Sequence, residues 1–328
     1  MESNFINIDE YYKISNLDNV VDFISFLKNH DGYREIFNHY DEHLLHRGDV
    51  EKILTNSLYL DFTKIYCFAD ENQRKDLELL FFRYEINVLK SCIRLIYNTE
   101  EAYDLSYFHT FFSKHSDINV SVLASSHSME EYINNLKGTK YHPILVKLQT
   151  SGHATSFDYE MQLDIYYFKQ MWKLKDKHLK GDTIKSFTNR LGTEIDLLNI
   201  MWIFRSKSIY DMSTADILSS IIPINYKLPK DQLIKLANAA SIDEFYSTLK
   251  LSHYKSLAVS LQDGTMESAF HSIVDRIYKK NKNKYPASMA TVNYYLFQKD
   301  TEVSRLTTAL ECIRYGLDPQ VKLKYIMQ

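Results

Sequence analysis

The segment Glu194–Tyr210 reads EIDLLNIMWIFRSKSIY, and its apolar pattern is the strongest structural signal in the chain. Over residues 195–204 apolar side chains occupy nearly every face of a helix, interrupted only by Asp196 and Asn199. A helix that is apolar all round is normally buried among other helices. We therefore expect this helix to form the centre of a helical lobe, with Trp202 packed in its core.

The start of this segment recurs twice at a nearly constant distance. The three copies read EINVLK at 85–90, EIDLLN at 194–199 and EVSRLT at 302–307, which are 109 and 108 residues apart. Repetition at a fixed period indicates a repeated structural unit. We expect the glutamates of the three copies to lie at equivalent positions in three similar lobes. They are either functional carboxylates or, the interpretation that we favour, charges at helix starts that pair with nearby Arg or Lys. They are Glu85, Glu194 and Glu302.

Basic residues follow each of these apolar segments. A cation near a helix C-terminus interacts favourably with the helix dipole, so these residues are expected to close the three central helices. They are Arg94, Arg205 with Lys207, and Arg314.

A second motif recurs in the same order. Residues 128–141 read SMEEYINNLKGTKY and residues 241–254 read SIDEFYSTLKLSHY, 113 positions later. A serine followed three residues later by glutamate predicts a capping box at a helix start. We place a degenerate third copy at residues 49–59, and a smaller echo reads YDLS at 103–106 and YDMS at 210–213.

The composition also favours helices. The chain has 8 glycines and 5 prolines among 328 residues, about a third of the usual share, so few tight turns can be built. Hydrophobic residues make up 45%, enough for a substantial core. We predict an all-α fold of three helical lobes, with boundaries at residues 1–104, 105–212 and 213–328.

Charge, cysteine content and hydropathy restrict the class of protein. A net charge of −3 argues against a globally basic nucleic-acid binder. Three cysteines are too few for a disulfide framework and indicate buried free thiols in a reducing compartment. The chain lacks a signal-like start, and its most apolar stretch is far shorter than a membrane span of about 18 residues. We expect a cytoplasmic protein.

No residue pattern points to catalysis. The sequence lacks a glycine-rich phosphate loop and the common hydrolase and metalloprotease motifs. His43 and His46 have no neighbouring cysteine or paired carboxylate that would complete a metal site. We expect no cofactor and no metal. The basic run 279–284 is read either as a patch for nucleic acid or an acidic partner or, preferably, as a solvated loop between helices.

These motifs together resemble the C subunits of V-type and archaeal-type rotary ATPases, whose counterparts in eukaryotic enzymes are the d subunits. The resemblance rests on Glu194–Tyr210, on IPINYKL at 222–228, and on the segment 302–326 with RYGLDPQV at 314–321. It covers about residues 40–328, and the order, spacing and triple occurrence of the motifs make it specific. The acidic first 30 residues differ from the Arg-rich first helix that is usual in this family.

The resemblance implies a specific fold and function. It implies three lobes arranged as a funnel around a central opening. The opening would receive the rotating central-stalk subunits, and the molecule would sit on the cytoplasmic face of the membrane proteolipid ring. The protein would transmit torque for ATP-coupled ion transport, without an active site, bound nucleotide, nucleic-acid partner or membrane span of its own, and would be peripherally membrane-associated through the complex.

The family-motif residues are expected to be structural or to lie at interfaces. They are Glu85, Glu194, Asp196, Asn199, Trp202, Arg205, Glu302 and Arg314. The alternative is a free-standing helical-repeat adaptor, which would bind another partner through an open superhelix with a concave groove.

Overall fold

The computed structural model describes residues 4–97, 104–150, 152, 154–210 and 212–327. It is 74% helix, and the described residues contain no strand, which confirms the all-helical prediction. The chain divides into two compact units, one of residues 1–69 with 291–328 and one of residues 70–290. The three predicted lobes remain a prediction, and positions 103 and 211 of the YDLS and YDMS echo lie outside the described residues.

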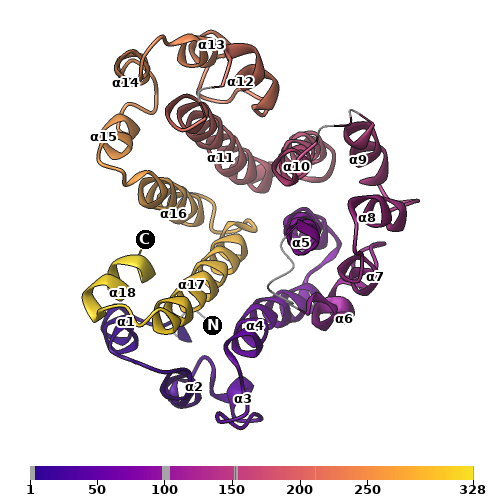
Figure 1. The fold of residues 1–328 in the computed structure, drawn as a ribbon, viewed down its shortest axis with the longest axis vertical. Coiled ribbons are helices and arrows are strands. Elements are labelled where there is room, and N and C mark those ends of the chain that lie inside the picture. The colour runs from indigo at the N-terminus through magenta and orange to yellow at the C-terminus, as the bar shows by residue number, and fades with distance from the viewer. Residues whose placement is uncertain (1–3, 98–103, 151, 153, 211, 328) are drawn as a thin grey trace. The chain divides into compact units, whose positions relative to one another are not determined.

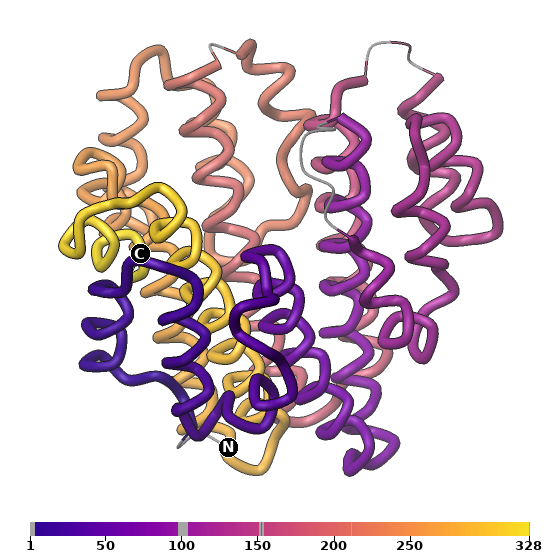
Figure 2. Tube along the Cα trace, turned by 60° about the horizontal axis from the view of Figure 1, so that its bottom comes forward, coloured from indigo at the N-terminus to yellow at the C-terminus, as the bar shows by residue number. Residues whose placement is uncertain are grey.

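The first unit is assembled from both ends of the chain. Helix α18 lies against α1, as the yellow and indigo segments show in Figures 1 and 2. Lys322, which is 1% exposed, donates a hydrogen bond from Nζ to the Leu17 carbonyl at 2.6 Å and pairs with Asp18 at 3.2 Å. The helices are α1 (Ile8–Ser15), α2 (Val20–Asn29), α3 (Arg34–Phe37), α4 (Arg47–Phe68), α17 (Ala290–Arg314) and α18 (Pro319–Ile326).

The second unit contains long helices joined by groups of short ones. Helix α5 packs on α10, and α11 packs on α16 (Figure 1). The long helices are α5 (Glu71–Tyr97), α10 (Ser156–His178), α11 (Gly181–Ser208) and α16 (Met266–Lys284). The short ones are η2 (Leu105–Phe108), α6 (His109–Phe112), α7 (Val120–Ala124), α8 (Met129–Asn135), α9 (His142–Gln149), α12 (Thr214–Ser220), α13 (Lys230–Asn238), α14 (Ile242–Lys250) and α15 (Leu257–Gln262).

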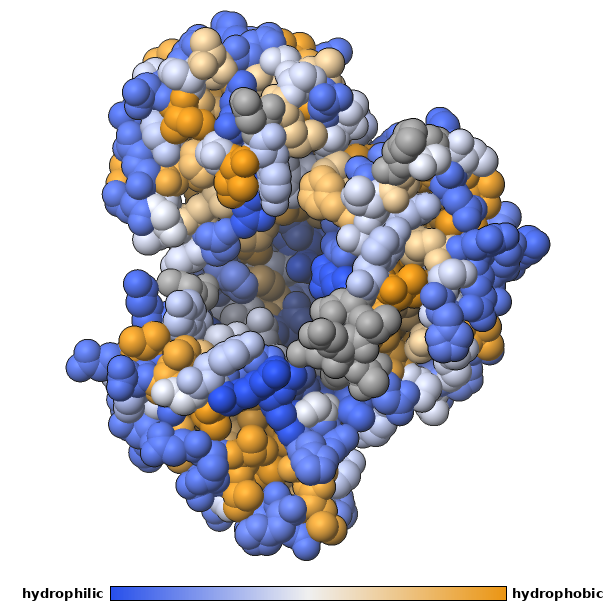
Figure 3. Space-filling model, viewed as in Figure 1, coloured by the Kyte–Doolittle hydropathy of each residue, from blue (hydrophilic) through white to orange (hydrophobic). Residues whose placement is uncertain are grey.

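Short amphipathic helices cover the long ones. Within α14 the buried residues are Phe245 and Leu249, four positions apart on one face. The face of the second unit seen in Figure 3 is mostly hydrophilic, with hydrophobic residues scattered over it. The apolar side chains of the short helices therefore form a core with the long helices.

The breaks between these helices differ from the expectation at the basic run 279–284. A loop joins α12 to α13 around Pro223, and Gly264, with φ of 68°, separates α15 from α16. The basic run 279–284, however, belongs to the end of α16 and is not a loop. Asp275 and Lys279 form an i,i+4 ion pair at 2.8 Å, which supports a helix at this point.

Candidate functional site

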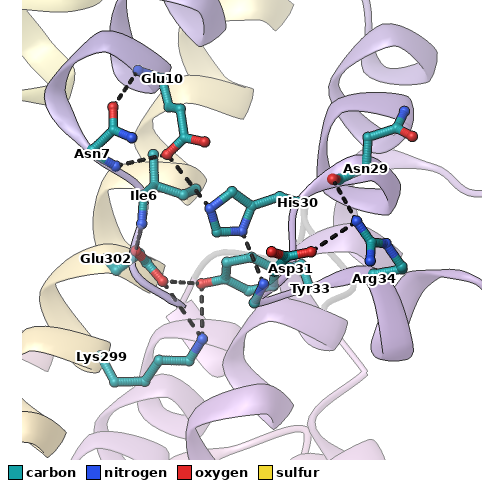
Figure 4. A network of polar contacts seen from close by, with 11 residues as sticks. Ile6, Asn7, Glu10, Asn29, His30, Asp31, Tyr33, Arg34, Lys299 and Glu302 are labelled. Atoms are coloured by element: carbon teal, nitrogen blue, oxygen red, sulfur yellow. Dashed lines mark hydrogen bonds and ion pairs between the residues drawn. The ribbon is translucent and has the colours of Figure 1, made fainter. Parts of the chain in front are cut away.

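Three long helices each carry a buried carboxylate that accepts a hydrogen bond from a tyrosine hydroxyl. In the first unit this carboxylate is Glu302 of α17, which is 4% exposed. Its Oε1 accepts from the Tyr33 hydroxyl and its Oε2 from the Ile6 backbone N–H, each at 2.6 Å (Figure 4). Lys299 donates to the Tyr33 hydroxyl at 2.9 Å and lies 3.6 Å from Glu302. Both ends of the chain are therefore joined at one carboxylate.

Burial governs the titration of this cluster. Desolvation lowers the pKa of Lys299, and the nearby Glu302 carboxylate opposes this shift. Desolvation and the same carboxylate raise the pKa of Tyr33 well above its ordinary value. The tyrosine therefore remains a protonated donor at neutral pH.

The corresponding carboxylate of α5 is Glu85. Its Oε2 accepts from the Tyr141 hydroxyl and from Lys140 Nζ, both at 2.7 Å, and its Oε1 accepts from the Ser116 hydroxyl. Burial, followed by the charge of Glu85, raises the pKa of Tyr141. This pair connects α5 to the chain segment immediately before α9.

On α11 the tyrosine binds Asp196 and not Glu194. Asp196 Oδ2 accepts from the Tyr254 hydroxyl at 2.8 Å and from the Lys227 and Leu228 backbone N–H groups at 2.6 and 3.0 Å. Its Oδ1 accepts from the Tyr226 N–H at 3.2 Å. Burial raises the pKa of Asp196, and its hydrogen bonds oppose that shift. Asp196 thus makes the tyrosine contact that Glu85 and Glu302 make on their own helices.

Glu194 instead takes part in an arginine cluster. It accepts from Arg190 at 2.9 Å and from Arg83 of α5 at 3.3 Å. The Arg190 guanidinium also lies over the rings of Phe187 and Tyr278, 4.8 and 5.7 Å from their centroids, a favourable arrangement for a buried cation. All three predicted glutamates are buried in the middle of long helices, so the expected helix-start position is wrong, whereas each does lie near an Arg or Lys.

Asn199 and Gly192 hold the loop that follows α12. Asn199 donates to the Ile222 carbonyl and accepts from the Ile222 N–H, both at 2.9 Å. One helical turn before Asp196, Gly192 lies directly under the Tyr226 ring, where an added Cβ would come within 2.4 Å of a ring carbon. The segment 222–228 is therefore fixed along α11 by backbone hydrogen bonds and close packing.

We expect Gly192→Ala to lower the free energy of unfolding by about 1–3 kcal/mol, because the Tyr226 ring must move away from its position. Gly48→Ala is the matched control: Gly48 also lies in a helix, and an added Cβ there meets nothing within 4 Å. The control is expected to stabilise by about 0.4–1 kcal/mol. Urea titration measures both values, and equal effects of the two substitutions would contradict the close contact.

The predicted capping boxes are half correct. Ser128 and Ser241 do cap their helices, accepting from the N–H groups of Glu131 and Glu244, each at 3.1 Å. Each glutamate carboxylate, however, accepts from the residue before the cap: His127 N–H at 2.9 Å and Ala240 N–H at 2.7 Å. The carboxylate therefore extends one residue further than in a standard capping box.

The third copy of this motif is not at residues 49–59, which lie inside the long helix α4. It is at residues 19–33, NVVDFISFLKNHDGY, with one residue inserted before the tyrosine. Asn19 caps α2 by accepting from the Asp22 N–H at 2.8 Å, Leu27 is buried, and Tyr33 binds Glu302. The tyrosine that ends each copy of this motif is the residue that binds the buried carboxylate, so its recurrence in the sequence could have predicted these contacts.

The other predicted motif residues lie apart from these clusters. Trp202, which we expected in the core, is partly exposed, so the helices around α11 within its unit leave part of this side chain open. Arg205 pairs with Glu267 in the first turn of α16. Arg314 is exposed in the last turn of α17, 4.0 Å from Glu311. Within the second unit, Glu85, Glu194, Asp196 and Arg205 each bind different partners.

The cysteines differ from the prediction in one case. Cys92 and Cys312 are buried free thiols, but Cys67 is exposed. Burial raises the pKa of Cys92 to about 12, so this thiol is inert at neutral pH. None of the three forms a disulfide.

The geometry favours structural connection over chemistry at these clusters. The carboxylates are satisfied by tyrosine, lysine, arginine and backbone donors, and the tyrosines are held protonated. Within the described part of the chain, no group of three or more His, Cys, Asp or Glu side chains is placed to hold a metal ion. None of the described helices combines the length and the hydropathy that crossing a membrane requires.

Comparison with known proteins defines the class of this all-helical protein. The sequence model of the ATP synthase (C/AC39) subunit family matches residues 1–325. The C subunit of the A-type ATP synthase of Methanosarcina barkeri is 24% identical over 98% of this chain and 88% of its own length. The C subunit of the A-type ATP synthase of Thermococcus kodakarensis is 20% identical over 99% of this chain and 87% of its own length. That of Pyrococcus abyssi is 27% identical over 61% of this chain and 55% of its own length.

Proteins of this family are subunits of rotary ATPases, which transport ions. This chain belongs to the ATP synthase (C/AC39) subunit family, because the match extends over nearly all of its 328 residues. The resemblance that the Glu194–Tyr210 segment and its repeats indicate is therefore confirmed.

Proposed function

We propose that this chain is the non-catalytic connector of a V-type rotary ATPase, linking the central rotor shaft to the membrane proteolipid ring and transmitting torque between them. The observation that carries the proposal is the family match over residues 1–325, which covers nearly the whole chain. In this function the protein is peripherally membrane-associated through its complex, and three lobes surround the opening that receives the shaft.

A part that transmits torque must resist deformation, and the buried clusters supply stiffness. Hydrogen bonds to charged groups contribute about 1.5–3 kcal/mol each, and Glu302, Glu85 and Asp196 each accept at least two. The exposed Arg94 adds a bidentate pair with Glu160 of α10, at 2.9 and 2.6 Å, a geometry that fixes relative orientation. These contacts keep short helices in register with long ones under load.

Torque must enter and leave through two interfaces. Stable protein interfaces bury more than about 1,000 Å² in total, so we expect two contacts of at least this size, one to the shaft and one to the ring. A shaft that is not threefold symmetric cannot contact three similar lobes in the same way. One lobe is therefore expected to dominate the shaft contact.

We expect the complex assembled without this chain to hydrolyse ATP but to move no ions in response, because shaft and ring lose their rotational register. The measurement is ATP hydrolysis and ATP-driven ion uptake in reconstituted vesicles with and without the chain. Adding back the purified chain should restore uptake, and the chain alone should neither bind nor hydrolyse ATP. Unchanged ion uptake in its absence would exclude the connector and favour the free-standing adaptor.

A further inference from the structure

A basic pocket of about 550 Å³ lies in the second unit, between the N-terminal part of α11 and the end of α16. Three exposed lysines surround it: Lys185 of α11 and Lys280 and Lys284 of α16. None of the described residues that line the pocket is acidic. The pocket therefore has a charge opposite to the net charge of −3 of the whole chain.

The pocket has an ordered polar floor. Asn189 Nδ2 donates to Asn281 Oδ1 at 3.0 Å, and Asn281, which is 2% exposed, donates to the Ser186 carbonyl at 3.0 Å. Asn189 Oδ1 lies 3.4 Å from both the Tyr226 hydroxyl and Lys227 Nζ. The two helices and the 222–228 segment thus meet at one amide pair, which sets the spacing of the lysines above it.

Helix stability alone does not explain why these lysines lie together around the pocket. Lys284 in the last turn of α16 complements the dipole of its own helix. Lys185, however, lies in the second turn of α11, at the end where the dipole disfavours a cation, and Asp182 is its paired carboxylate at 2.9 Å. Burial and the charge of Lys280 also lower the pKa of Lys227. Such an arrangement of like charges is stabilised when an anionic group enters.

The composition of the pocket favours a protein segment as the anion. Small-molecule pockets are concave and bury most of their ligand, whereas this one is wide open to solvent, and its lining combines lysines and amides with the side chains of Tyr226 and Tyr285. Phosphate is held by the backbone N–H groups of glycine-rich turns, by bidentate arginines or by lysines acting as point charges, and of these the described lining residues supply lysines alone, without the geometry that fixes a single phosphate. Flexible lysines suit carboxylates that are spread along a peptide.

We propose that this pocket receives an acidic segment of a neighbouring protein of the same complex. Its Asp or Glu carboxylates bind Lys185, Lys280 and Lys284, and its apolar side chains rest on Tyr226 and Tyr285. The identity of the partner rests on the proposed connector function. The acidic chemistry of the docking segment follows from the pocket.

The test is a variant of the full chain with Lys185→Gln, Lys280→Gln and Lys284→Gln. Its binding to the complex assembled without this chain is measured at about 50 and 300 mM salt, conditions that separate charge-dependent from other binding. We expect binding at least about 10-fold weaker at the lower salt, with a smaller salt dependence than the unchanged chain shows. The control carries Lys137→Gln, Lys235→Gln and Lys250→Gln, three lysines outside the pocket, and should bind normally.

Carbodiimide cross-linking identifies the partner, because it joins a lysine directly to a carboxylate in contact with it. We expect cross-links from the pocket lysines to Asp or Glu of one neighbouring protein in the complex. Equal binding of both triple variants would overturn the proposal, as would specific binding of inorganic phosphate to the isolated chain that the pocket variant loses. If ion uptake does not need the chain but these cross-links form, the connector function fails while the docking pocket stands.

Discussion

Replacing Asp196 with alanine is expected to lower the free energy of unfolding of the second unit by about 3–5 kcal/mol. The substitution leaves four donors without their acceptor: the N–H groups of Tyr226, Lys227 and Leu228 and the hydroxyl of Tyr254. Each buried donor that loses its partner costs about 1–3 kcal/mol. The effects are less than additive because the loop can partly reach water.

Tryptophan fluorescence during urea unfolding measures this effect selectively, since both tryptophans of the chain, Trp172 and Trp202, belong to the second unit. Tyr254→Phe removes one of the four hydrogen bonds and is expected to cost about 1–2 kcal/mol. Asp243→Ala, at an exposed position in the first turn of α14, should change stability by less than about 1 kcal/mol. A loss below about 1 kcal/mol for Asp196→Ala would show that the carboxylate does not hold this loop.

Replacing Glu302 with alanine is expected to destabilise the first unit by a similar amount, about 3–5 kcal/mol. The Ile6 N–H and the Tyr33 hydroxyl lose their acceptor, and Lys299, which is 5% exposed, loses its nearby carboxylate. A buried ammonium without a counter-charge is costly. The loss should be greatest where the N-terminal segment meets α17.

Hydrogen exchange resolved by peptide locates this effect. We expect faster exchange in α1, α2 and α17 of Glu302→Ala. The double variant Glu302→Gln with Lys299→Met should recover most of the protection, because it removes both charges together and keeps the side-chain volumes similar. Unchanged exchange in α1 and α2 would mean that Glu302 does not join the chain ends.

The sequence contained enough information for the fold class and for the long central helices. Scarce glycine and proline predicted helices, and the apolar segments around Glu85, Glu194 and Glu302 each proved to lie on a long helix. The N-cap serines Ser128 and Ser241 were also correct. These features depend on short-range periodicity and capping, which local sequence expresses directly.

The carboxylate–tyrosine pairs could not be predicted in the same way. Tyr33 and Glu302 are 269 positions apart, and no local pattern joins them. On α11 the tyrosine binds Asp196, which lies two residues after Glu194. The alignment of Glu194 with Glu85 and Glu302 therefore predicted a tyrosine contact that Asp196 makes instead. The copy at residues 19–33 was missed because asparagine replaces the capping serine and one inserted residue shifts the tyrosine.

The first unit draws its helices from both ends of the chain, which has a consequence during synthesis. Residues 1–69 leave the ribosome before the 221 residues of the second unit are made, and only then does the rest of the first unit follow. At about 5–20 residues per second, this interval is about 10–45 s. During it, the side chains of Phe23, Leu27 and Phe37, which are fully buried in the finished protein, lack the C-terminal part of their own unit. The nascent chain therefore carries an uncovered apolar segment for most of its translation, and chaperones that bind such segments have their target at its start.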